Sequence, residues 1–439
     1  MPAWSGRAAQ AWAPRRSERS SSCRTVRLLW TNTRSVMTRE PAPRNPYRPG
    51  AAVPPVFLAG RESQINRFSA TLRAAPELPP NVRIAGLRGV GKTVLLRRLE
   101  EVAQGDGWAT IRVQVEPRHN AEAVLADLIN ELCERASLKI SRLRRLRETM
   151  RGVVEAAGGL VKVTWQDIEL SMTNLDRREE QSIARNLYRT AARADQHGLA
   201  GLLLMFDEAQ VIRDDMARDG EHPLSLLVAA ANTLQEAGLP VGLVLCGLPT
   251  LRTNLLRART YSERMFRGEE VSSLAGPEAV EAFVRPLEGT GVSADGDLVE
   301  RVVEEVEGYP YFVQLWGAEL WEAAHLAGVG NLSTLLLAEI EQDIYRRLDL
   351  DFYEPRVDSL TPAEQDLLLA TTNCPYPPLK TGDIHTRSGK KEGNVNVLMG
   401  RLTEQGVLFR VQMGQYEYTA PKFHAYLQRR AARLAQSGR

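Results

Sequence analysis

Cysteines are few in this chain, and none of them are paired in the sequence. Only Cys23, Cys133, Cys246 and Cys374 occur in 439 residues, and no C-x-x-C motif is present. Neither a zinc site nor a disulfide framework is therefore expected. The sequence also lacks any stretch that approaches the roughly 18 consecutive apolar residues of a membrane span. We therefore expect a cytoplasmic protein.

Acidic residues are scarce at the N-terminus. Residues 1–45 contain nine arginines and two glutamates, and they lack the apolar region of a secretory signal. Their Arg- and Ser-rich composition resembles an organellar transit peptide. Alternatively, the segment is a disordered basic tail, or the true start is Met37. We expect residues 1–50 to be a disordered basic extension, with the folded part beginning near Pro54.

Beyond this extension, strand-like apolar runs alternate with amphipathic helical stretches. This alternation predicts an α/β fold in which helices cover both faces of a parallel sheet. A partly alternating stretch at Val153–Leu170 is compatible with an inserted hairpin. The expected strands are Val82–Ala85, Ala109–Val115, Leu202–Phe206 and Val241–Cys246, and the expected helices are Lys92–Ala103, Ala121–Ala136 and Arg178–Asp195.

The strand signal fades after Leu274. The following stretches have helical spacing, and a last region mixes helices with two short strands. We expect a core at 51–275, a helical segment at 276–350, a C-terminal module at 351–430 and a tail at 431–439. The helices expected in the helical segment are Pro277–Leu287, Asp297–Val306, Tyr311–Leu326 and Ser333–Leu348.

A glycine-rich turn lies between the first expected strand and its helix. Gly86-x-x-x-x-Gly91-Lys92-Thr93 matches the P-loop pattern in the strand–helix context that the pattern requires. Inward-facing N–H groups and the positive end of the helix form an anion cradle, on which side chains at Gly86 and Gly91 would intrude. Lys92 should reach the β- and γ-phosphates, and the Thr93 hydroxyl should ligate Mg²⁺. The residues expected to bind a nucleoside triphosphate are Gly86, Leu87, Arg88, Gly89, Val90, Gly91, Lys92, Thr93 and Val94.

An acidic pair follows a second apolar run. Leu202–Phe206 leads directly into Asp207 and Glu208. In P-loop ATPases the first such acid helps to hold Mg²⁺, and the second orients and deprotonates the attacking water. We assign Asp207 to the metal and Glu208 to the water. The bland alternative is an acidic pair in a solvated loop.

Recognition of a family rests on a segment before the P-loop. Leu58-Ala59-Gly60-Arg61-Glu62 resembles the "F-x-G-R-E" opening of AAA+ ATPases of the initiator type, which includes origin-recognition and Cdc-like replication ATPases. Leu58 stands where an aromatic residue is usual. The resemblance implies a P-loop NTPase αβα sandwich with a parallel sheet, a helical lid and a C-terminal winged helix. It also implies that Leu58, Gly60 and Arg61 flank the adenine.

Two further segments resemble the same family. Val244–Leu251 is similar to its fourth core strand and "G-x-P-x-L" exit, with Cys246 in place of a polar sensor residue. Tyr261–Phe266 is similar to the arginine-bearing turn before the fifth strand. Arg264 is then a candidate to stabilise transition-state charge at a neighbouring subunit. Two alternatives remain: a solvent-facing arginine, or the same role for one of the nearby Arg257, Arg259 and Arg267.

Glu307–Phe312 lies where many AAA+ proteins carry a lid arginine, and it contains none. The segment resembles instead the "G-x-P" of STAND switch ATPases, in which the proline packs against the nucleotide. The resemblance implies that Pro310 contacts the nucleotide, and it favours slow hydrolysis or tight nucleotide retention. A plain helix start with Pro310 at the first position is equally compatible.

The last region has the pattern of a winged helix. Thr361, Pro362 and Glu364 form a capping box with proline at the first helical position, and two more helices and a hairpin follow. Residues 380–439 carry eleven Lys and Arg against four Asp and Glu, which favours DNA contact; a protein-binding or autoinhibitory role is the alternative. The residues expected at DNA are Lys390, Lys391, Asn394, Asn396 and Arg401.

Three functions are compatible with these motifs. The first is an ATP-hydrolysing machine whose winged helix contacts double-stranded DNA. A homo-oligomer is compatible with this function. The second is a STAND-like regulatory switch that acts through protein partners. The third is a nucleotide-holding scaffold, against which the complete set Lys92, Thr93, Asp207 and Glu208 argues. We favour the first, with ATP and Mg²⁺ as cofactors.

Overall fold

The computed structural model describes residues 44–50, 53–150, 178–214, 221–259 and 262–436, with the backbone alone for 142–150. Asn45–Arg439 form one compact unit. The hairpin expected at Val153–Leu170 lies outside the described residues. Within them, no helix combines the length and apolar character that a membrane crossing requires.

Five parallel strands form the central sheet in the order β2-β3-β4-β1-β5. The predicted α/β fold with a parallel sheet is therefore confirmed. Every residue of β3 and β4 is buried, as expected for parallel strands with helices on both faces. The strands are β1 (Val82–Gly86), β2 (Trp108–Gln114), β3 (Gly201–Asp207), β4 (Val241–Gly247) and β5 (Arg267–Val271).

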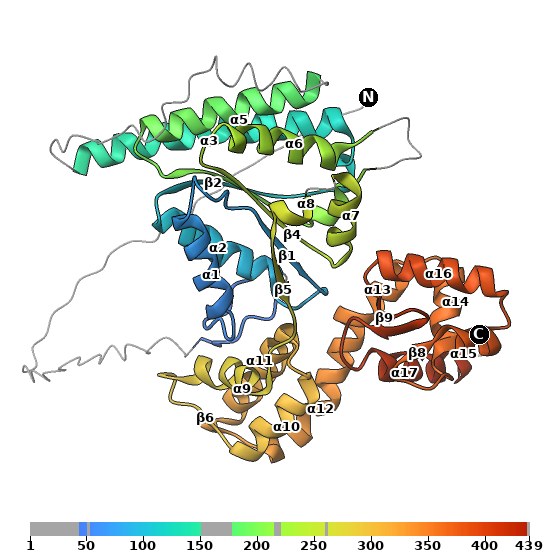
Figure 1. Ribbon diagram of the computed structural model, residues 1–439. Helices are drawn as coiled ribbons and strands as arrows, with labels where there is room; N and C mark the ends of the chain where they lie inside the picture. The colour runs from blue at the N-terminus through green and yellow to red at the C-terminus, as the bar shows by residue number, and fades with distance from the viewer. Residues whose placement is uncertain (1–43, 51–52, 151–177, 215–220, 260–261, 437–439) are drawn as a thin grey trace, which may run out of the picture. The chain divides into compact units, whose positions relative to one another are not determined.

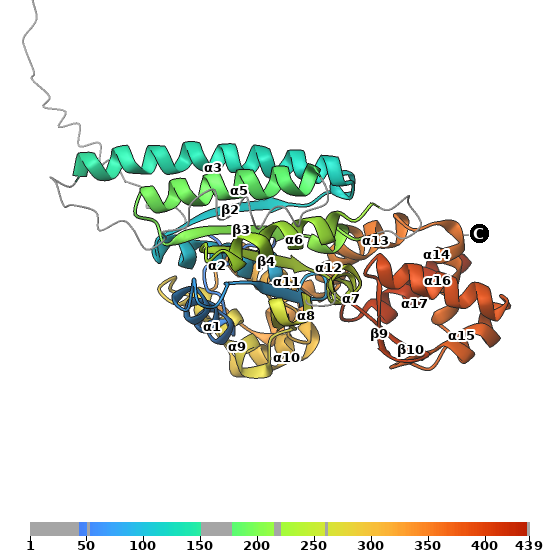
Figure 2. The ribbon, with the colours of Figure 1, turned by 45° about the horizontal axis from the view of Figure 1, so that its top comes forward.

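The side chains of each central strand alternate between two hydrophobic cores. In β3, Leu203 and Met205 pack on the side of α1 and α2, whereas Leu204 and Phe206 pack on the side of α3, α5 and α6. Figures 1 and 2 show these two helical layers on opposite faces of the sheet. The helices are α1 (Glu62–Arg73), α2 (Lys92–Gly105), α3 (Glu122–Met150), α5 (Arg178–Gln196), α6 (Pro223–Glu236) and α7 (Thr250–Ala258).

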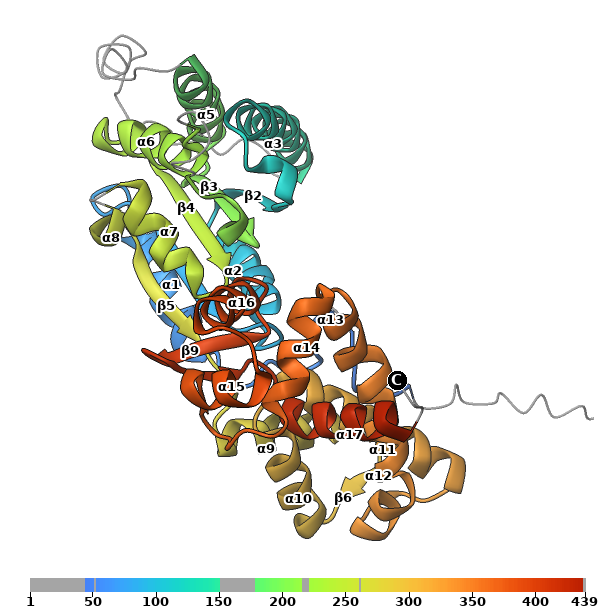
Figure 3. The ribbon, with the colours of Figure 1, turned by 90° about the vertical axis from the view of Figure 1, so that its right-hand side faces the viewer.

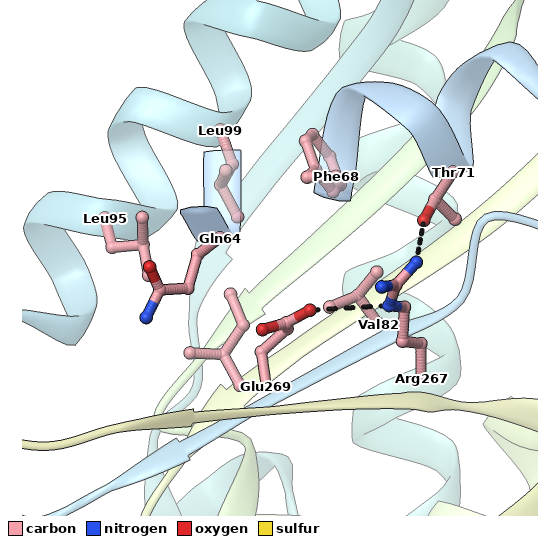
Figure 4. Close-up of a pocket in the computed structure, with 9 residues that line it drawn as sticks. Gln64, Phe68, Thr71, Val82, Leu95, Leu99, Arg267 and Glu269 are labelled. Carbon is pink, nitrogen blue, oxygen red and sulfur yellow. Dashed lines mark hydrogen bonds and ion pairs between the residues drawn. The ribbon is translucent and has the colours of Figure 1, made fainter. Parts of the chain in front are cut away.

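A buried carboxylate lies on β5, at the edge of the sheet. Glu269 is 7% exposed and accepts a hydrogen bond of 2.8 Å from Nε of Arg67. Arg267 lies 3.4 Å from the same carboxylate and donates to the hydroxyl of Thr71 on α1 (Figure 4). The space between these side chains cannot admit a water molecule. These side chains are therefore closely packed.

A helical subdomain follows β5, and an N-terminal segment packs against it. Tyr47 is 3% exposed, and its hydroxyl donates to the carbonyl of Phe283 at 2.5 Å. A Cβ on Gly317 would lie 2.4 Å from the Tyr47 ring, so this glycine admits the ring. The expectation that the folded part begins near Pro54 is wrong for residues 45–50. The helices are α9 (Gly276–Val284), α10 (Gly296–Val306), α11 (Pro310–Ala327) and α12 (Thr334–Leu348).

The C-terminal module contains a small antiparallel sheet of order β8-β10-β9. Figure 3 shows its strand β9 among the helices of the module. The capping box of Thr361 and Glu364 is confirmed at the start of its first helix. A stack of Tyr353 on Tyr426, with centroids 4.8 Å apart, joins the module to the helices before it. Its elements are α14 (Pro362–Thr371), β8 (Leu379–Lys380), α15 (Thr381–Ser388), α16 (Glu392–Glu404), β9 (Leu408–Gln412), β10 (Gln415–Tyr418) and α17 (Phe423–Gln436), preceded by the short α13 (Glu354–Asp358).

Candidate nucleotide-binding site

The glycine-rich turn connects β1 to α2 as expected. Gly91 is the N-cap residue of α2 and has a φ of 89°, and Gly89 has a φ of 81°. Residues with a Cβ rarely adopt such left-handed conformations, so both positions favour glycine. The turn brings the amides at the start of α2 to one place, where the positive end of the helix dipole favours an anion.

Gly86 is required for a reason other than the one we inferred. A Cβ at this position would lie 2.1 Å from the carbonyl oxygen of Val271 on β5. Gly86 does not line the cavity described below. A side chain at position 86 would therefore collide with the neighbouring strand. The inference that it would intrude on the anion cradle is wrong.

Lys92 lies at the first position of α2 and is 7% exposed. Its ammonium group donates to the carbonyl oxygen of Leu87 at 2.7 Å. Burial lowers the pKa of Lys92, and the carboxylates of Glu208 and Asp207 act in the opposite direction. A buried ammonium whose bonded partner is a neutral carbonyl is suited to receive an anion.

The two acids lie at the end of β3 but differ in their surroundings. Asp207 is 4% exposed and accepts a hydrogen bond of 3.0 Å from the amide of Glu208. Glu208 has a φ of 56°, which is unusual for a residue with a side chain. Burial raises the pKa of Cys246 well above its usual range, so this thiol beside Asp207 is neutral.

Gln210, which lies outside every motif of the sequence, holds the Glu208 side chain. Its Nε2 donates to Oε2 of Glu208 at 2.6 Å, while its Oε1 accepts from the amide of Leu248 at 3.0 Å. Gln210 therefore connects Glu208 to the residue that follows β4. No local motif could reveal this contact, because Leu248 is far away in the sequence.

A cavity of about 610 Å³ opens over the glycine-rich turn. This volume is within the usual range of small-molecule sites, about 300–1,000 Å³. Most of its charged side chains are cationic. They are Arg48, Arg61, Arg88, Lys92 and Arg356, against the acids Glu208 and Asp351.

Among the residues predicted to bind nucleotide, Arg88–Val94, Leu58, Arg61 and Pro310 line this cavity, whereas Leu87 and Gly60 do not. Arg61 is 4% exposed, and its guanidinium donates to the carbonyls of Val90 and Ser272 at 3.1 and 2.7 Å. Arg61 therefore connects the glycine-rich turn to the residue that follows β5. The metal ligand predicted at Thr93 lines the cavity, and the one predicted at Asp207 lies outside its lining.

The helical subdomain is attached to the glycine-rich turn. Pro310 occupies the first position of α11, as one interpretation of the sequence predicted. The preceding Tyr309 is 1% exposed, and its hydroxyl donates to the carbonyl of Arg88 at 2.6 Å. A Cβ on Gly89 would lie 1.8 Å from this hydroxyl oxygen. Glycine at position 89 is therefore needed for this contact as well as for its φ.

The remaining predicted residues lie away from the cavity. Arg264 is exposed on the short helix α8 (Ser262–Met265) before β5, and it does not line the cavity. On α16, Asn394 and Arg401 are exposed and share one face because they are seven residues apart. Asn396 is also exposed but lies on the other flank of the helix, so the structure does not bring it together with them. Lys391 is exposed at the N-cap, and Lys390 is half-buried, 4.0 Å from Asp366.

Comparison with known families agrees with this geometry. Residues 58–245 match the family described as AAA ATPase domain. This segment belongs to the AAA ATPases. The predicted AAA+ P-loop ATPase is thereby confirmed, and it is a nucleotide-binding domain. Residues 350–427 match a separate family, described as a domain of unknown function, DUF8462.

Several solved structures are similar to this chain. The Aeropyrum pernix ORC2 protein, in ADPNP–ADP complexes, is 13% identical over 87% of this chain and 97% of that chain, with a TM-score of 0.50. The Walker-type ATPase PABY2304 of Pyrococcus abyssi is 16% identical over 84% and 96%, with a TM-score of 0.48. The Aeropyrum pernix ORC1 protein in complex with DNA is 18% identical over 87% and 95%, with a TM-score of 0.42. The chain matches no curated protein.

Proposed function

We propose that this AAA ATPase binds ATP with Mg²⁺, hydrolyses the ATP slowly and couples its nucleotide state to a C-terminal winged helix that contacts DNA. The observation that carries the proposal is the buried Lys92 at the head of α2, in a cavity whose charged lining is mainly cationic. Phosphate release by the purified chain, measured with and without duplex DNA, tests it. Absence of phosphate release under both conditions would contradict it.

Each residue of the site has a distinct role in this proposal. Lys92 and the amides of the turn hold the β- and γ-phosphates. Thr93 and Asp207 are the residues that would hold Mg²⁺, which neutralises phosphate charge when bound. Glu208 orients a water molecule and takes its proton. Leu58 and Pro310 line the same cavity and provide apolar contacts to the nucleotide.

Slow hydrolysis is supported by the contact of Glu208 with Gln210. The Gln210 amide donates to the Glu208 carboxylate at 2.6 Å, so this carboxylate already has a bonded partner. Glu208 must leave this partner, or share it, before it takes a proton from water. The absence of arginine in Glu307–Phe312 is consistent with the same conclusion.

The order of elements supports a winged helix at the C-terminus. Helix α14, strand β8, helices α15 and α16 and the β9–β10 hairpin succeed one another, with α16 in the place of a recognition helix. Asn394, Val397 and Arg401 form one exposed face of α16. We propose that this face and Lys391 contact duplex DNA, with Lys390 beside them. Asn396 makes no contact in this arrangement.

Replacement of both Lys390 and Lys391 by alanine should weaken DNA binding and reduce its dependence on salt. Each phosphate contact that is lost lowers the number of counterions released on binding. The magnitude of the slope of log K against log salt should therefore decrease by about 0.9 per contact. Fluorescence anisotropy of labelled duplex at several salt concentrations measures the slope. Lys139→Ala, on the distant helix α3, is the control. If the wild-type chain binds no DNA, or binds it with an affinity that does not depend on salt, this result would contradict DNA contact and favour the regulatory switch.

The regulatory switch is the second candidate, and one contact favours it. A Cβ on Gly406, which follows α16, would lie 3.2 Å from Nε of Arg88 in the glycine-rich turn. The C-terminal module therefore touches the nucleotide-binding turn directly. In this candidate function, bound nucleotide keeps the module against the core, and protein partners recognise the released module.

We propose that Arg264 acts at the cavity of a neighbouring subunit, because it is exposed and does not line the cavity of its own chain. Lys92→Ala and Arg264→Ala chains should each be inactive alone, and their mixture should regain part of the ATPase activity. The regained activity comes from interfaces that pair an intact cavity with an intact Arg264. An inactive mixture, with mixed oligomers verified by native mass spectrometry, would leave Arg264 a surface residue.

A further inference from the structure

We propose that Arg356, which belongs to the C-terminal segment matched to the domain of unknown function, binds a phosphate group of the nucleotide. This residue would make the 350–427 segment part of the nucleotide site. The inference rests on the proposed ATP binding and adds to it a ligand-binding residue from outside the AAA ATPase segment.

The position of Arg356 is the first observation. It lies on α13, more than a hundred residues beyond the AAA ATPase segment that ends at 245. It nevertheless lines the same cavity of about 610 Å³ as Lys92 and Thr93. The chain therefore folds back so that one cationic side chain of the C-terminal segment reaches the space above the glycine-rich turn.

The Arg356 side chain is held in a defined orientation. Its guanidinium carbon lies 3.5 Å from the centroid of the Phe352 ring, and one Nη donates to the Phe352 carbonyl oxygen. Phe352 in turn stacks on Tyr311, with centroids 5.3 Å apart. A guanidinium stacked by its face keeps its edge donors available, and little rotamer entropy is lost when they bind a phosphate.

The charges around Arg356 are those of an anion site. Among the described residues no carboxylate forms an ion pair with it, and the neighbouring Asp351 pairs instead with Arg347 at 3.4 Å. Burial lowers the pKa of Arg356, and the nearby Arg88 lowers it further. Two guanidinium groups that line one cavity repel each other, and a phosphate placed between them would offset this repulsion.

A purely structural role for Arg356 is the alternative. In that case its stacking on Phe352 would stabilise the aromatic cluster that joins α11 to α13, and the affinity for nucleotide phosphates would not depend on Arg356. The two roles differ in one respect. A phosphate-binding arginine distinguishes nucleotides from the nucleoside, whereas a structural arginine affects all ligands through the fold.

The test uses the full chain and the variants Arg356→Gln and Arg356→Lys. We expect Arg356→Gln to weaken ATP or ADP binding about tenfold or more, with adenosine binding unchanged. Lysine keeps the charge without the planar fork, so Arg356→Lys should regain part of the loss. Arg346→Gln is the control, because Arg346 is exposed on α12 and pairs with Asp343. Thermal unfolding without nucleotide verifies that each variant is folded.

A second measurement separates the two roles even if Arg356→Gln is destabilised. ATP should slow hydrogen exchange of the backbone at 350–360 in the wild-type chain and should have a smaller effect in Arg356→Lys. ATP and ADP affinities equal to wild type in both variants would overturn this inference and leave the proposed ATPase intact. A wild-type chain that binds no ATP would overturn both.

Discussion

Replacement of Lys92 by alanine should weaken binding of ATP–Mg²⁺ by on the order of 100-fold. The Lys92 ammonium is buried at the head of α2 and can exchange the Leu87 carbonyl at 2.7 Å for phosphate oxygens. Charge-assisted hydrogen bonds to phosphate are about twice as strong as neutral ones. Titration with a fluorescent ATP analogue measures the loss.

Arg98→Ala is the matched control for this variant. Arg98 lies on the same helix, is exposed and pairs with Glu101 at 2.8 Å, so its removal should leave ATP affinity unchanged. Thermal unfolding without nucleotide should differ little between Lys92→Ala and the wild type, because alanine is compatible with the helix and no buried acid bonds to Lys92. Equal ATP affinity of Lys92→Ala and the wild type would refute the assigned role.

Glu208→Gln should bind ATP as the wild type does and should lower the hydrolysis rate by about 10²–10⁴-fold. Glutamine keeps the size of the side chain but cannot accept the proton of the attacking water. The neighbouring Gln210 can still contact the new amide, so the local structure should persist. Single-turnover release of phosphate from bound ATP separates this effect from binding.

Glu101→Gln is the control for the second variant, because Glu101 is exposed on the outer side of α2. Its turnover should equal that of the wild type. A Glu208→Gln chain that releases phosphate at the wild-type rate would remove Glu208 as the base. In that event the proton acceptor would have to be sought elsewhere in the cavity.

The sheet and the glycine-rich turn could be predicted because their signals are local. Four strands are largely apolar runs, and their expected bounds differ from the observed ones by at most one residue at either end. Strand β5 reads Arg-Gly-Glu-Glu-Val and has no such run. Its edge position lets charged side chains reach α1 and solvent, so apolar pattern alone could not reveal it.

Contacts between distant residues could not be predicted. Tyr47 packs on Gly317, and Arg356 lines the cavity over the glycine-rich turn, yet neither lies in a pattern that specifies a partner. The need for glycine at position 86 was predicted correctly for the wrong reason, because the neighbour that forbids a side chain is Val271 on another strand. A motif fixes the residue type and leaves the packing partner open.

The residues predicted to contact DNA illustrate the same difference within one helix. Residue type alone grouped Asn396 with Asn394 and Arg401. Once the bounds Glu392–Glu404 are known, helical geometry places Asn396 on the opposite flank. Composition could therefore suggest a partner for this module, and the helix register was needed to choose the face.

The central claim is that one ATP–Mg²⁺ binds each chain at the head of α2. Isothermal titration of the purified full chain with ATP in the presence of Mg²⁺ tests it most directly. We predict saturable binding with a stoichiometry of about one nucleotide per chain, and binding on the order of 100-fold weaker in Lys92→Ala. Titration of folded wild-type protein without any binding heat at several temperatures would contradict the account.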